Sequence, residues 1–472
     1  MPPPRIAPRL HLAALALAAC ALCAYAAPAA IAPAAEKTPP PFAFDPAPST
    51  YRPLPRVDTL IKNAIILDGA GRRLDHADIL LRQGKVAAIG PQLQAPDAVV
   101  IDARGRWITP GIIDIHSHDG DDSAPLTTGL ADVNEDTDPD TANVWAEHSV
   151  NTQDPSFTRA LAAGVTLMDL FPGSTNMFGG RTAVIKPITA PTVQQMKFPD
   201  APYSLKMACG ENPKDTYGEK GRFPATRMGE VAGERDAFLR AREYLNKWLA
   251  YERGQSAEPP ARDLKMDTLA GVLHGDILVQ MHCYTADDMS VQLSLAHEFG
   301  FHITAFHHAS EAYKIADLLA DQKVCAVMWP DYWGFKMEAF DGIPEDAAFV
   351  DAAPGGCAIM HSDLRVRQVH LNNETARAMA AGRRAGLTIT PEQAIRWITS
   401  NPAKAMGLAD RVGSLEPGKN ADLVLWSGDP FSVYTRVDQV FVDGALAFDR
   451  NDPAHQPKSD FELGQPAQER LP

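Results

Sequence analysis

The middle of the sequence alternates between short apolar runs and helical patterns. The runs include GVTLMDLFPGS, YSLKMACGEN, DILVQMHCYTADD, FHITAFHHASE, KVCAVMWPDYW and GGCAIMHSD. Each run ends in polar or glycine-rich residues, and helical patterns such as EAYKIADLLADQ follow several of them. Continuous apolar strands that alternate with helices are typical of a parallel sheet buried on both faces. With this many units, the pattern predicts an α/β fold closed into a (β/α)₈ TIM barrel.

Short strands separated by Gly and Asp turns flank this region on both sides. They occupy about residues 57–105 and 418–449, and we expect the two segments to pair into one small composite β-sandwich. The predicted organisation is a sandwich from 57–106 plus 408–450, a barrel over 107–407 and a C-terminal tail over 451–472.

The first residues have the pattern of an export signal. Arg5 and Arg9 precede the apolar stretch LHLAALALAACALCAYA, and AYA at 24–26 fits a small-x-small cleavage site. We therefore expect a signal peptide over residues 1–26 and an exported protein, periplasmic or secreted. The mature chain is expected to have no transmembrane segment, because Pro and small residues follow the apolar stretch at once.

An alternative leaves the protein attached to a lipid. The sequence LAAC at 17–20 also matches lipoprotein-type cleavage before Cys20, although the apolar run continues past that cysteine. Residues 27–56 are rich in Ala and Pro, which indicates an extended linker and not a domain.

The overall charge narrows the class of partner. The chain carries a net charge of −15 with 45% hydrophobic residues, as expected of a globular protein with a sizeable core. An acidic surface argues against nucleic acid and against an anionic membrane face. We expect a small-molecule substrate, and a homo-oligomer stays open.

Four cysteines remain after signal cleavage, namely Cys209, Cys283, Cys325 and Cys357. An exported protein can oxidise them. Cys325 and Cys357 fall early in successive predicted strands, and Cys209 and Cys283 fall near the ends of another successive pair. Neighbouring strands lie about 4.8 Å apart, close to what a disulfide tolerates. We expect four free buried thiols, with these two pairings as the alternative.

Two histidines end an apolar strand in the segment GIIDIHSHDG, residues 111–120. Side chains alternate along a strand, so His116 and His118 point the same way. Two imidazoles about one strand repeat apart can bind one metal ion. The alternative is two polar residues where a strand meets solvent.

Metal-competent residues recur at the ends of the other predicted strands. In chain order they are His116 and His118, then Lys206 or Glu211, then His282, then His307 or His308, then Asp363. Active sites of barrels lie at the C-terminal ends of their strands. Taken singly, each histidine is more simply a solvated residue, and Asp363 is more simply a helix cap. Taken together, the strand ends predict a metal centre.

The sequence resembles the amidohydrolase superfamily, in its imidazolonepropionase-related, secreted dipeptidase-like branch. The resemblance rests on ITPGIIDIHSHDG, AAGVTLMDLFPGS, LKMACGENPK, HHASEAYKIAD, MHSD and TSNPAKAMGLADRVGSLEPGKNADLVLWSGDP, and it covers about residues 57–450. It implies one or two divalent ions, with Zn²⁺ expected, that activate water to cleave a C–N bond. The HExxH helix of metalloproteases and the GxSxG turn of serine hydrolases do not occur.

The resemblance also implies roles for the strand-end residues. His116 and His118 would bind the more buried ion, and a carboxylated Lys206 would bridge two ions, with Glu211 as the alternative bridge. His282 and His308 would hold the second ion. His308 is preferred to His307 because it lies three residues before Glu311. Asp363 would contact the metal and transfer the proton, so Asp363 and His308 are the expected catalytic residues.

Several further residues are candidates for contacts around the reaction centre. Those expected to touch substrate are Arg181, Tyr284, Trp329, Tyr332 and Trp333. Arg181 would bind a substrate carboxylate, the alternative being an ordinary surface arginine. The aromatic residues would line the pocket, the alternative being lid or core packing. Asp114 lies on the same strand face as His116 and is expected to orient its ring, a structural salt bridge being the alternative.

The substrate is less constrained than the reaction class. The expected substrate is a dipeptide or an N-acyl amino acid, with imidazolonepropionase-like hydrolysis of a cyclic amide as the alternative. A different class of alternative is a barrel without catalytic activity that acts as a binding or scaffold protein. Loss of ligands would mark such a protein, and none of the expected ligands is missing.

Overall fold

The computed structural model describes residues 38–456. The predicted signal peptide over 1–26, Cys20 and the first part of the predicted linker lie outside these residues, as does most of the predicted tail. In the described part of the chain, no helix is both long and apolar enough to cross a membrane.

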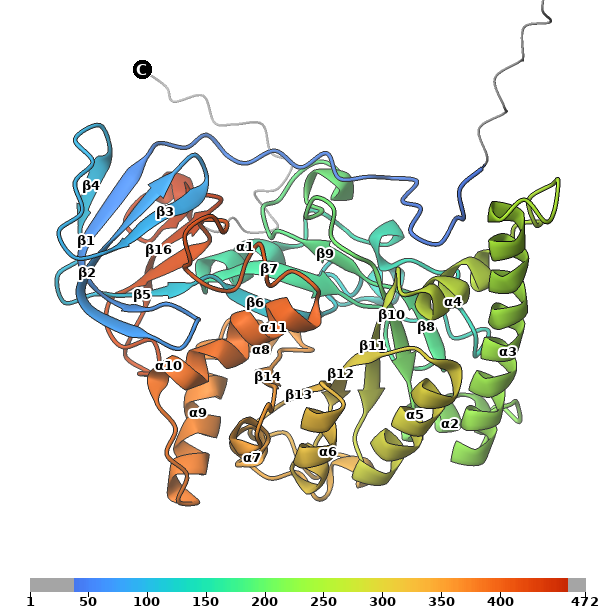
Figure 1. The fold of residues 1–472 in the computed structure, drawn as a ribbon. Helices are drawn as coiled ribbons and strands as arrows, with labels where there is room; N and C mark the ends of the chain where they lie inside the picture. Colours follow the sequence, from blue (N-terminus) through green and yellow to red (C-terminus); the bar gives the residue numbers. More distant parts are fainter. Residues whose placement is uncertain (1–37, 457–472) are drawn as a thin grey trace, which may run out of the picture. The chain divides into compact units, whose positions relative to one another are not determined.

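A wall of short strands in two hydrogen-bonded sheets forms the centre of the molecule (Figure 1). The smaller sheet has the order β6-β7-β9, and the larger has the order β14-β13-β12-β11-β10-β8. Seven of these strands pair in parallel: β6 (Ile112–Ser117), β7 (Val165–Leu170), β10 (Ser204–Ala208), β11 (Leu278–Cys283), β12 (Ile303–His308), β13 (Cys325–Met328) and β14 (Ala358–Met360). The chain therefore has the predicted TIM-barrel fold, with the polar strand ends gathered at one rim.

One position of the barrel differs from the regular parallel arrangement. β8 (Phe178–Arg181) pairs antiparallel with β10, and β9 (Ala183–Ile185) pairs antiparallel with β7. The connection after β7 is too short to contain a crossover helix, and a short connection can join only antiparallel strands. The expectation of eight parallel strands was wrong at this position for that reason.

Helices follow most of the parallel strands and cover the outside of the wall. They are α1 (Pro155–Ala162), α2 (Glu211–Gly218), α3 (Arg227–Glu252), α4 (Leu264–His274), α5 (Ala286–Phe299), α6 (Ala316–Asp321), α7 (Asp346–Ala352), α8 (Arg365–Gln368), α9 (Leu371–Arg384), α10 (Pro391–Ala394) and α11 (Ser400–Ala405). The start of α5 is typical: the Thr285 side chain caps it, and left-handed Gly300 ends it.

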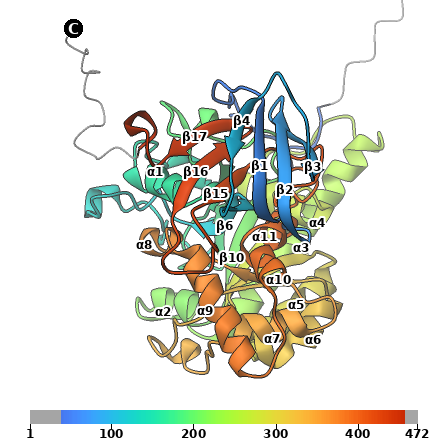
Figure 2. The ribbon, with the colours of Figure 1, turned by 90° about the vertical axis from the view of Figure 1, so that its left-hand side faces the viewer.

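Outside the two sheets of the barrel, the strands at both ends of the described chain form one further sheet, the second sheet of the molecule after the barrel wall (Figure 2). Its strands are β1 (Thr59–Leu67), β2 (Arg73–Arg82), β3 (Lys85–Gly90), β4 (Val99–Asp102), β5 (Trp107–Pro110), β15 (Leu423–Trp426), β16 (Val437–Val442) and β17 (Ala445–Asp449). The order is β17-β16-β15-β5-β1-β2-β3, and β4 pairs with β1. The antiparallel pairing of β15 with β5 joins the two segments, which confirms the predicted composite β-structure.

Residues 38–56 have no helix or strand but pack against the rest of the molecule. Phe42 is fully buried and makes edge-to-face contacts with Tyr244 and Trp248 of α3. Farther along, the hydroxyl of Tyr51 donates to Asp443 beside the second sheet (2.7 Å). This part of the predicted linker is thus a strap that lies along the folded protein.

Two disulfides connect neighbouring barrel strands. Cys209 pairs with Cys283, and Cys325 pairs with Cys357, with Cα separations of 5.4 Å and 4.6 Å. The expectation of four free thiols was wrong, because adjacent parallel strands bring each pair to disulfide distance.

We predict that alkylation of the unreduced protein leaves Cys209, Cys283, Cys325 and Cys357 unmodified, as mass spectrometry of the intact chain will show. The bridged residues are 74 and 32 positions apart, so each bridge should contribute roughly 4 kcal/mol by constraining the unfolded chain. Replacing one pair by serine should lower the unfolding free energy only under oxidising conditions. An equal loss in reductant would contradict the disulfide.

Candidate metal centre

Six histidines meet at the C-terminal rim of the barrel. They are His116 in β6 and His118 directly after it, His282 in β11, His307 and His308 in β12, and His361 after β14. The ring centroids of His282 and His308 lie 4.5 Å apart, and that of His116 lies 5.0 Å from His308 and 5.2 Å from His361. The sequence prediction that strand-end histidines come together describes this arrangement.

Three of the predicted ligands form a compact donor set. One ligand atom from each of His116, His118 and Asp363 lies within 4.8 Å of the other two. Asp363 Oδ1 is 3.3 Å from His116 Nε2 and 3.4 Å from His118 Nε2. Two imidazole nitrogens and a carboxylate oxygen are suitable ligands for a divalent ion such as Zn²⁺.

The hydrogen bond of His118 identifies which of its nitrogens is free. Its Nδ1 lies 2.8 Å from the carbonyl oxygen of Phe171. A carbonyl oxygen only accepts, so Nδ1 carries the hydrogen, and the lone pair is on Nε2. That is the nitrogen that faces Asp363.

A longer chain of hydrogen bonds orients His116. Gln280 Nε2 donates to the carbonyl of Ala405 (3.1 Å), which leaves Gln280 Oε1 to accept from His307 Nε2 (2.8 Å). His307 Nδ1 then has a lone pair, and it accepts from His116 Nδ1 (3.0 Å). His116 Nε2 is therefore unprotonated, and it faces Asp363 and Lys206. His307 occupies both of its nitrogens in this chain, which favours His308 as the ligand in this strand.

The remaining histidines have ring nitrogens without partners. Both nitrogens of His282, both of His361 and Nδ1 of His308 are buried and have no hydrogen bond within residues 38–456. Buried polar atoms without a partner are uncommon and costly. Burial also holds the pKa of His282 and His308 well below the usual value and lowers that of His361 to about 3. Neutral imidazoles with free nitrogens fit a bound metal.

Lys206 extends from β10 into the same cluster. Its Nζ lies 3.2 Å from His116 Nε2, and the residue is 1% exposed. Burial lowers its pKa to about 7, against the opposing effect of the Asp363 carboxylate. A substantial fraction of this amine is thus uncharged at neutral pH, and only the uncharged form can ligate a metal or react with carbon dioxide.

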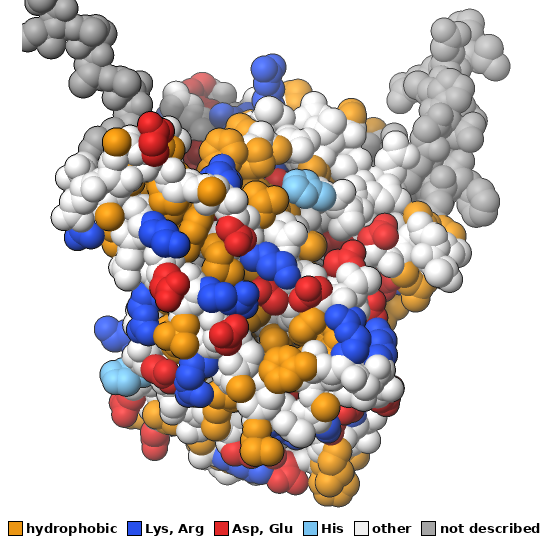
Figure 3. All heavy atoms as spheres, turned by 90° about the vertical axis from the view of Figure 1, so that its right-hand side faces the viewer, with side chains coloured by type: hydrophobic (Ala, Val, Ile, Leu, Met, Phe, Trp, Pro, Cys, Tyr) orange, Lys and Arg blue, Asp and Glu red, His pale blue; other side chains and the backbone are white. Residues whose placement is uncertain are grey.

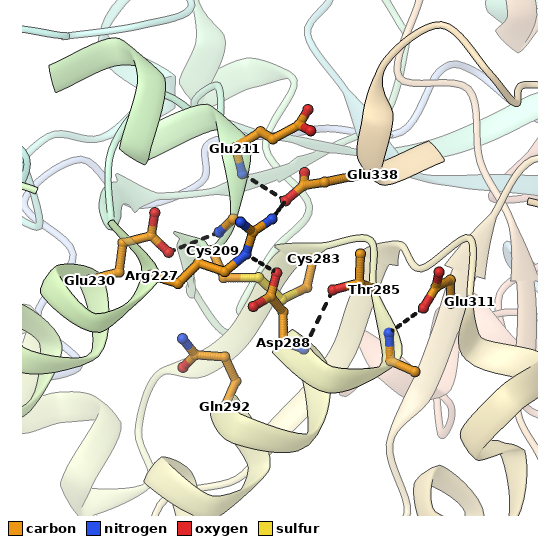
Figure 4. Close-up of a disulfide and its surroundings, with 12 residues drawn as sticks. Cys209, Glu211, Arg227, Glu230, Cys283, Thr285, Asp288, Gln292, Glu311 and Glu338 are labelled. Atoms are coloured by element: carbon orange, nitrogen blue, oxygen red, sulfur yellow. Dashed lines mark hydrogen bonds and ion pairs between the residues drawn. A yellow bond between two sulfur atoms is a disulfide. The ribbon is translucent and has the colours of Figure 1, made fainter. Parts of the chain in front are cut away.

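Glu211, the alternative to Lys206, has no hydrogen bond or ion pair with the histidines in the part of the chain that the structure describes. It begins α2, and its carboxylate is 3.9 Å from Lys336 Nζ. Figure 4 shows the carboxylate directed away from the Cys209–Cys283 disulfide, while its backbone N–H donates to Glu338 (2.7 Å). The structure therefore brings Lys206, and not Glu211, to the cluster.

Two residues of the rim have a left-handed backbone. The φ angles are 71° at His308 and 61° at Asp363, a region that non-glycine residues seldom occupy. Burial alone would raise the pKa of Asp363; when no metal ion is bound and His118 carries a proton on Nε2, its hydrogen bond and charge outweigh this and hold the pKa below its usual value. Asp363 is thus positioned as a carboxylate that can accept a proton.

Asp114 acts on the backbone of the site. Its carboxylate accepts from the hydroxyl and the backbone N–H of Ser362, and weakly from the backbone N–H of His116 (3.4 Å). The expected contact with the His116 ring is not formed, because His307 takes that position. Asp114 instead connects β6 to the residue before Asp363.

The predicted substrate residues divide between two places. Tyr284 stacks on His308, and Trp329 contacts His308 and Tyr332. A small cavity is lined by His308, Trp329 and Tyr332. Trp333 also lines this cavity and is 59% exposed. These aromatics line the approach to the histidines.

Arg181 lies elsewhere. It donates to Thr268 of α4 (2.9 Å) and faces the ring of Trp145. The structure does not bring Arg181 to the histidines, because it pairs with Leu205, which by alternation lies on the face of β10 opposite to Lys206.

Sequence reasoning assigned no role to His361 and Gln280, and it named His307 only as the alternative to His308 as a metal ligand. His361 lies two residues before Asp363, and this H-x-D spacing at a strand end was an available signal. His307 and Gln280 carried no comparable signal, because their role depends on a hydrogen bond between different strands.

Comparison with known proteins agrees with this geometry. A family model described as "Amidohydrolase family" matches residues 340–447. The solved structure of an amidohydrolase from Thermotoga maritima MSB8 is 38% identical, with a TM-score of 0.76 over 83% of this chain and 100% of that one. The chain belongs to the amidohydrolase superfamily. Members of this superfamily are hydrolases that act on C–N bonds.

Two further relatives extend the comparison. Amidohydrolase tasK of Hapsidospora irregularis is 31% identical over 83% of this chain, which spans 43% of the length of that relative. A putative prolidase from Bifidobacterium longum is 15% identical, with a TM-score of 0.52 over 86% of this chain and 97% of that one. The latter likeness concerns the fold alone.

We predict that Gln280→Leu lowers the affinity for divalent metal about 10- to 100-fold. Without the Gln280 acceptor, His307 no longer fixes the tautomer that presents His116 Nε2. Competition with a chromogenic chelator will measure the dissociation constant. Gln292→Leu is the matched control, because this buried glutamine bonds Glu234 on the outer helices. An equal loss of metal affinity in both variants would contradict the proposed role of the hydrogen bonds that run from Ala405 to His116.

A second prediction concerns pH. With bicarbonate present, the number of ions bound per chain should rise as the pH rises through about 7, because Lys206 then loses its proton. His116 and His282 should stay neutral across this window, since their pKa values lie well below it. Elemental analysis after equilibration on each side of that pH will measure the change.

The matched variants are Lys206→Met and Glu211→Gln. Lys206→Met should bind fewer ions and lose the pH dependence, whereas Glu211→Gln should behave like the unmodified protein. If Glu211→Gln loses the ion instead, Lys206 is not the bridging residue.

Proposed function

We propose that this chain hydrolyses the amide bond of a dipeptide or an N-acyl amino acid with the aid of one or two divalent ions, Zn²⁺ being the expected metal. The observation that supports the proposal is the convergence of His116, His118, His282, His308 and Asp363 at the barrel rim, with several ring nitrogens unpartnered. A donor set of this kind in an amidohydrolase favours catalysis over a scaffold role.

The ligand residues divide into two groups around the proposed ions. His116, His118 and Asp363 would hold one ion, and His282 and His308 would hold a second, with a carboxylated Lys206 between them. A bound divalent ion lowers the pKa of water and polarises a carbonyl group. Burial holds the pKa values of His116, His282 and His308 well below the usual value, and the neutral state preserves the lone pairs that this binding requires.

Asp363 is the proposed general base. It accepts a proton from the attacking water and then delivers it to the nitrogen that leaves. The bond from the Asp363 N–H to His116 O (2.9 Å) fixes its backbone at the rim.

Lys336 is the proposed contact for the substrate carboxylate. Its Nζ lies 3.9 Å from the centroid of the Tyr284 ring, and Tyr284 in turn stacks on His308. Lys336 also binds Glu338 (3.0 Å) and Asn212 (2.8 Å), which hold the ammonium group at this place. Because Arg181 lies outside the barrel wall, Lys336 is the basic residue that the geometry favours for this role.

We also propose that the protein acts after export. The two disulfides support an oxidising compartment, since such bonds are rare in the cytosol. The N-terminal signal pattern supports the same conclusion. Export favours peptide-derived or scavenged substrates.

We predict that purified protein cleaves members of a panel of dipeptides and N-acetyl amino acids, and that chelation abolishes this activity. Asp363→Asn should fold and lose at least about a hundredfold in kcat, because the variant removes the general base. Asp331→Asn is the matched control, since Asp331 bonds Arg367 and Arg377 at the same rim. Direct chromatographic measurement of the released amino acid will give the turnover rate.

The panel also distinguishes the alternatives. Carboxamide analogues of the same substrates should have a higher KM, and Lys336→Met should raise KM at least about tenfold for the acids only. Cleavage of cyclic amides alone would favour the imidazolonepropionase-like reaction. Full activity in chelator or in Asp363→Asn would remove the proposed mechanism.

A further inference from the structure

Arg181 is a buried cation without an ion pair. It ends β8 and is 1% exposed. Its Nε donates to Thr268, while its Nη1 is buried with no hydrogen-bond partner among residues 38–456, which also supply no ion pair to it. Burying a charge is costly unless an opposite charge or several hydrogen bonds compensate. The guanidinium therefore has unused capacity to bind an anion.

The nearby carboxylates are committed to other groups. Nη2 and Nε of Arg262 donate to Asp267 Oδ2 (2.6 and 2.8 Å). The hydroxyl of Tyr244 donates to Asp267 Oδ1 (2.6 Å). Asp45 binds Lys197 (2.8 Å). Neither carboxylate is bonded to Arg181, so the missing anion is not supplied by these neighbours.

Arg181 lines a cavity of about 270 Å³ whose other walls are partly apolar, with Asn143, His148, Arg262 and Asp267 as the other polar residues that line it. The ring of Trp145 lies 4.4 Å from the Arg181 guanidinium carbon. Phe44 of the strap and Leu264 at the start of α4 line the same cavity and are 56% and 61% exposed. A partly apolar cavity in which Arg181 is unpaired, while the other charged residues Arg262 and Asp267 bind each other, is complementary to a molecule with an anionic group and an apolar body.

The barrel wall separates this cavity from the histidines. Arg181 pairs with Leu205 of β10, and the next residue of β10, Lys206, pairs with Gly180. Paired residues share one face of a sheet, and successive residues alternate between faces. Lys206 points into the barrel, so Arg181 and Leu205 lie on its outer face.

The surface outside the cavity gives a useful contrast. On the face drawn in Figure 3, Lys and Arg side chains are interspersed with Asp and Glu. Exposed pairs of this kind compensate each other and are screened by salt. Arg181 differs from them because it is buried and unpaired.

We propose that the cavity lined by Arg181, Trp145, Phe44 and Leu264 is a second binding site, and that its ligand is a small carboxylate with an apolar body. A carboxylate matches the planar guanidinium and needs only one cation. A phosphate dianion fits less well, because the second arginine of the cavity, Arg262, is already bonded to Asp267. The site is independent of the proposed reaction.

Calorimetric titration with phenylacetate and with neutral phenylacetamide tests this proposal. We expect phenylacetate to bind and phenylacetamide to bind at least about tenfold more weakly. Arg181→Met should weaken phenylacetate binding by at least the same factor while keeping or raising the melting temperature, because it removes an uncompensated buried charge. Arg104→Met is the control, since the Arg104 side chain is 77% exposed in the second sheet.

Two further variants separate the possible sources of binding. Leu264→Asp adds a negative charge at an exposed edge of the cavity and should weaken binding of phenylacetate without unfolding the protein. Asp363→Asn should leave it unchanged, whereas phenylacetate bound at the metal centre would respond to Asp363→Asn and not to Arg181→Met. Equal affinity for acid and amide, binding that survives Arg181→Met, or no binding of phenylacetate would each overturn the proposal.

Discussion

The protonation of a single nitrogen, Nε2 of His116, depends on a hydrogen-bond chain that crosses the barrel. The chain begins at the carbonyl of Ala405 and passes through Gln280 and His307 before it reaches His116. It therefore joins α11, β11, β12 and β6. A displacement of any of these elements would remove a partner, and a neutral imidazole would then be free to exchange its two tautomers. The ligand geometry of the rim is in this sense a property of the closed barrel.

The same rim contains strained backbone. His308 and Asp363 both have left-handed φ angles, and such residues cost on the order of 1–3 kcal/mol each. One disulfide lies in the strand beside His308, since Cys283 of β11 pairs with His308 of β12, and the other lies just before the strand that leads to Asp363. Cys283 follows His282 directly, and Cys357 precedes β14, which leads to Asp363. Cross-links between neighbouring strands stabilise the wall, so that the rim can keep an arrangement that its local preferences oppose.

The residues that sequence reasoning found are those whose position follows from strand alternation. His116, His118, Lys206, His282 and Asp363 each end or interrupt an apolar run, and parallel strands bring such ends to one rim. The composite sheet was predictable in the same way, from alternating patterns at both ends of the chain. What these predictions share is a repeat that can be read along a single segment.

The residues that it missed depend on contacts between segments. Gln280 lies inside an apolar run and shows no sign of its partner in the next strand. Arg181 was expected at the substrate site because a guanidinium can bind a carboxylate, and its short sequence does not indicate which face of the barrel wall it lies on. Whether the disulfides form depends on the distance between strands. The sequence indicates only that each pair of cysteines falls in neighbouring predicted strands. In each case the deciding fact is a three-dimensional separation.

The reversed strand has a consequence for the whole molecule. A side chain at Gly180 would meet the carbonyl of Val144 at 2.3 Å, and one at Gly179 would lie 3.3 Å from the stem of Lys206. Gly180 thus allows the segment at Val144 to lie against β8, and Gly179 leaves room for the Lys206 side chain in the interior. Arg181 comes next and, by alternation, lies on the outer face with Leu205. A regular parallel strand would end at the C-terminal rim of the barrel. β8 runs in the opposite direction and ends with Arg181, which contacts Thr268 of α4. The departure from the regular barrel therefore leaves the inner face of this wall to the metal-competent residues and places an unpaired cation on the outer one.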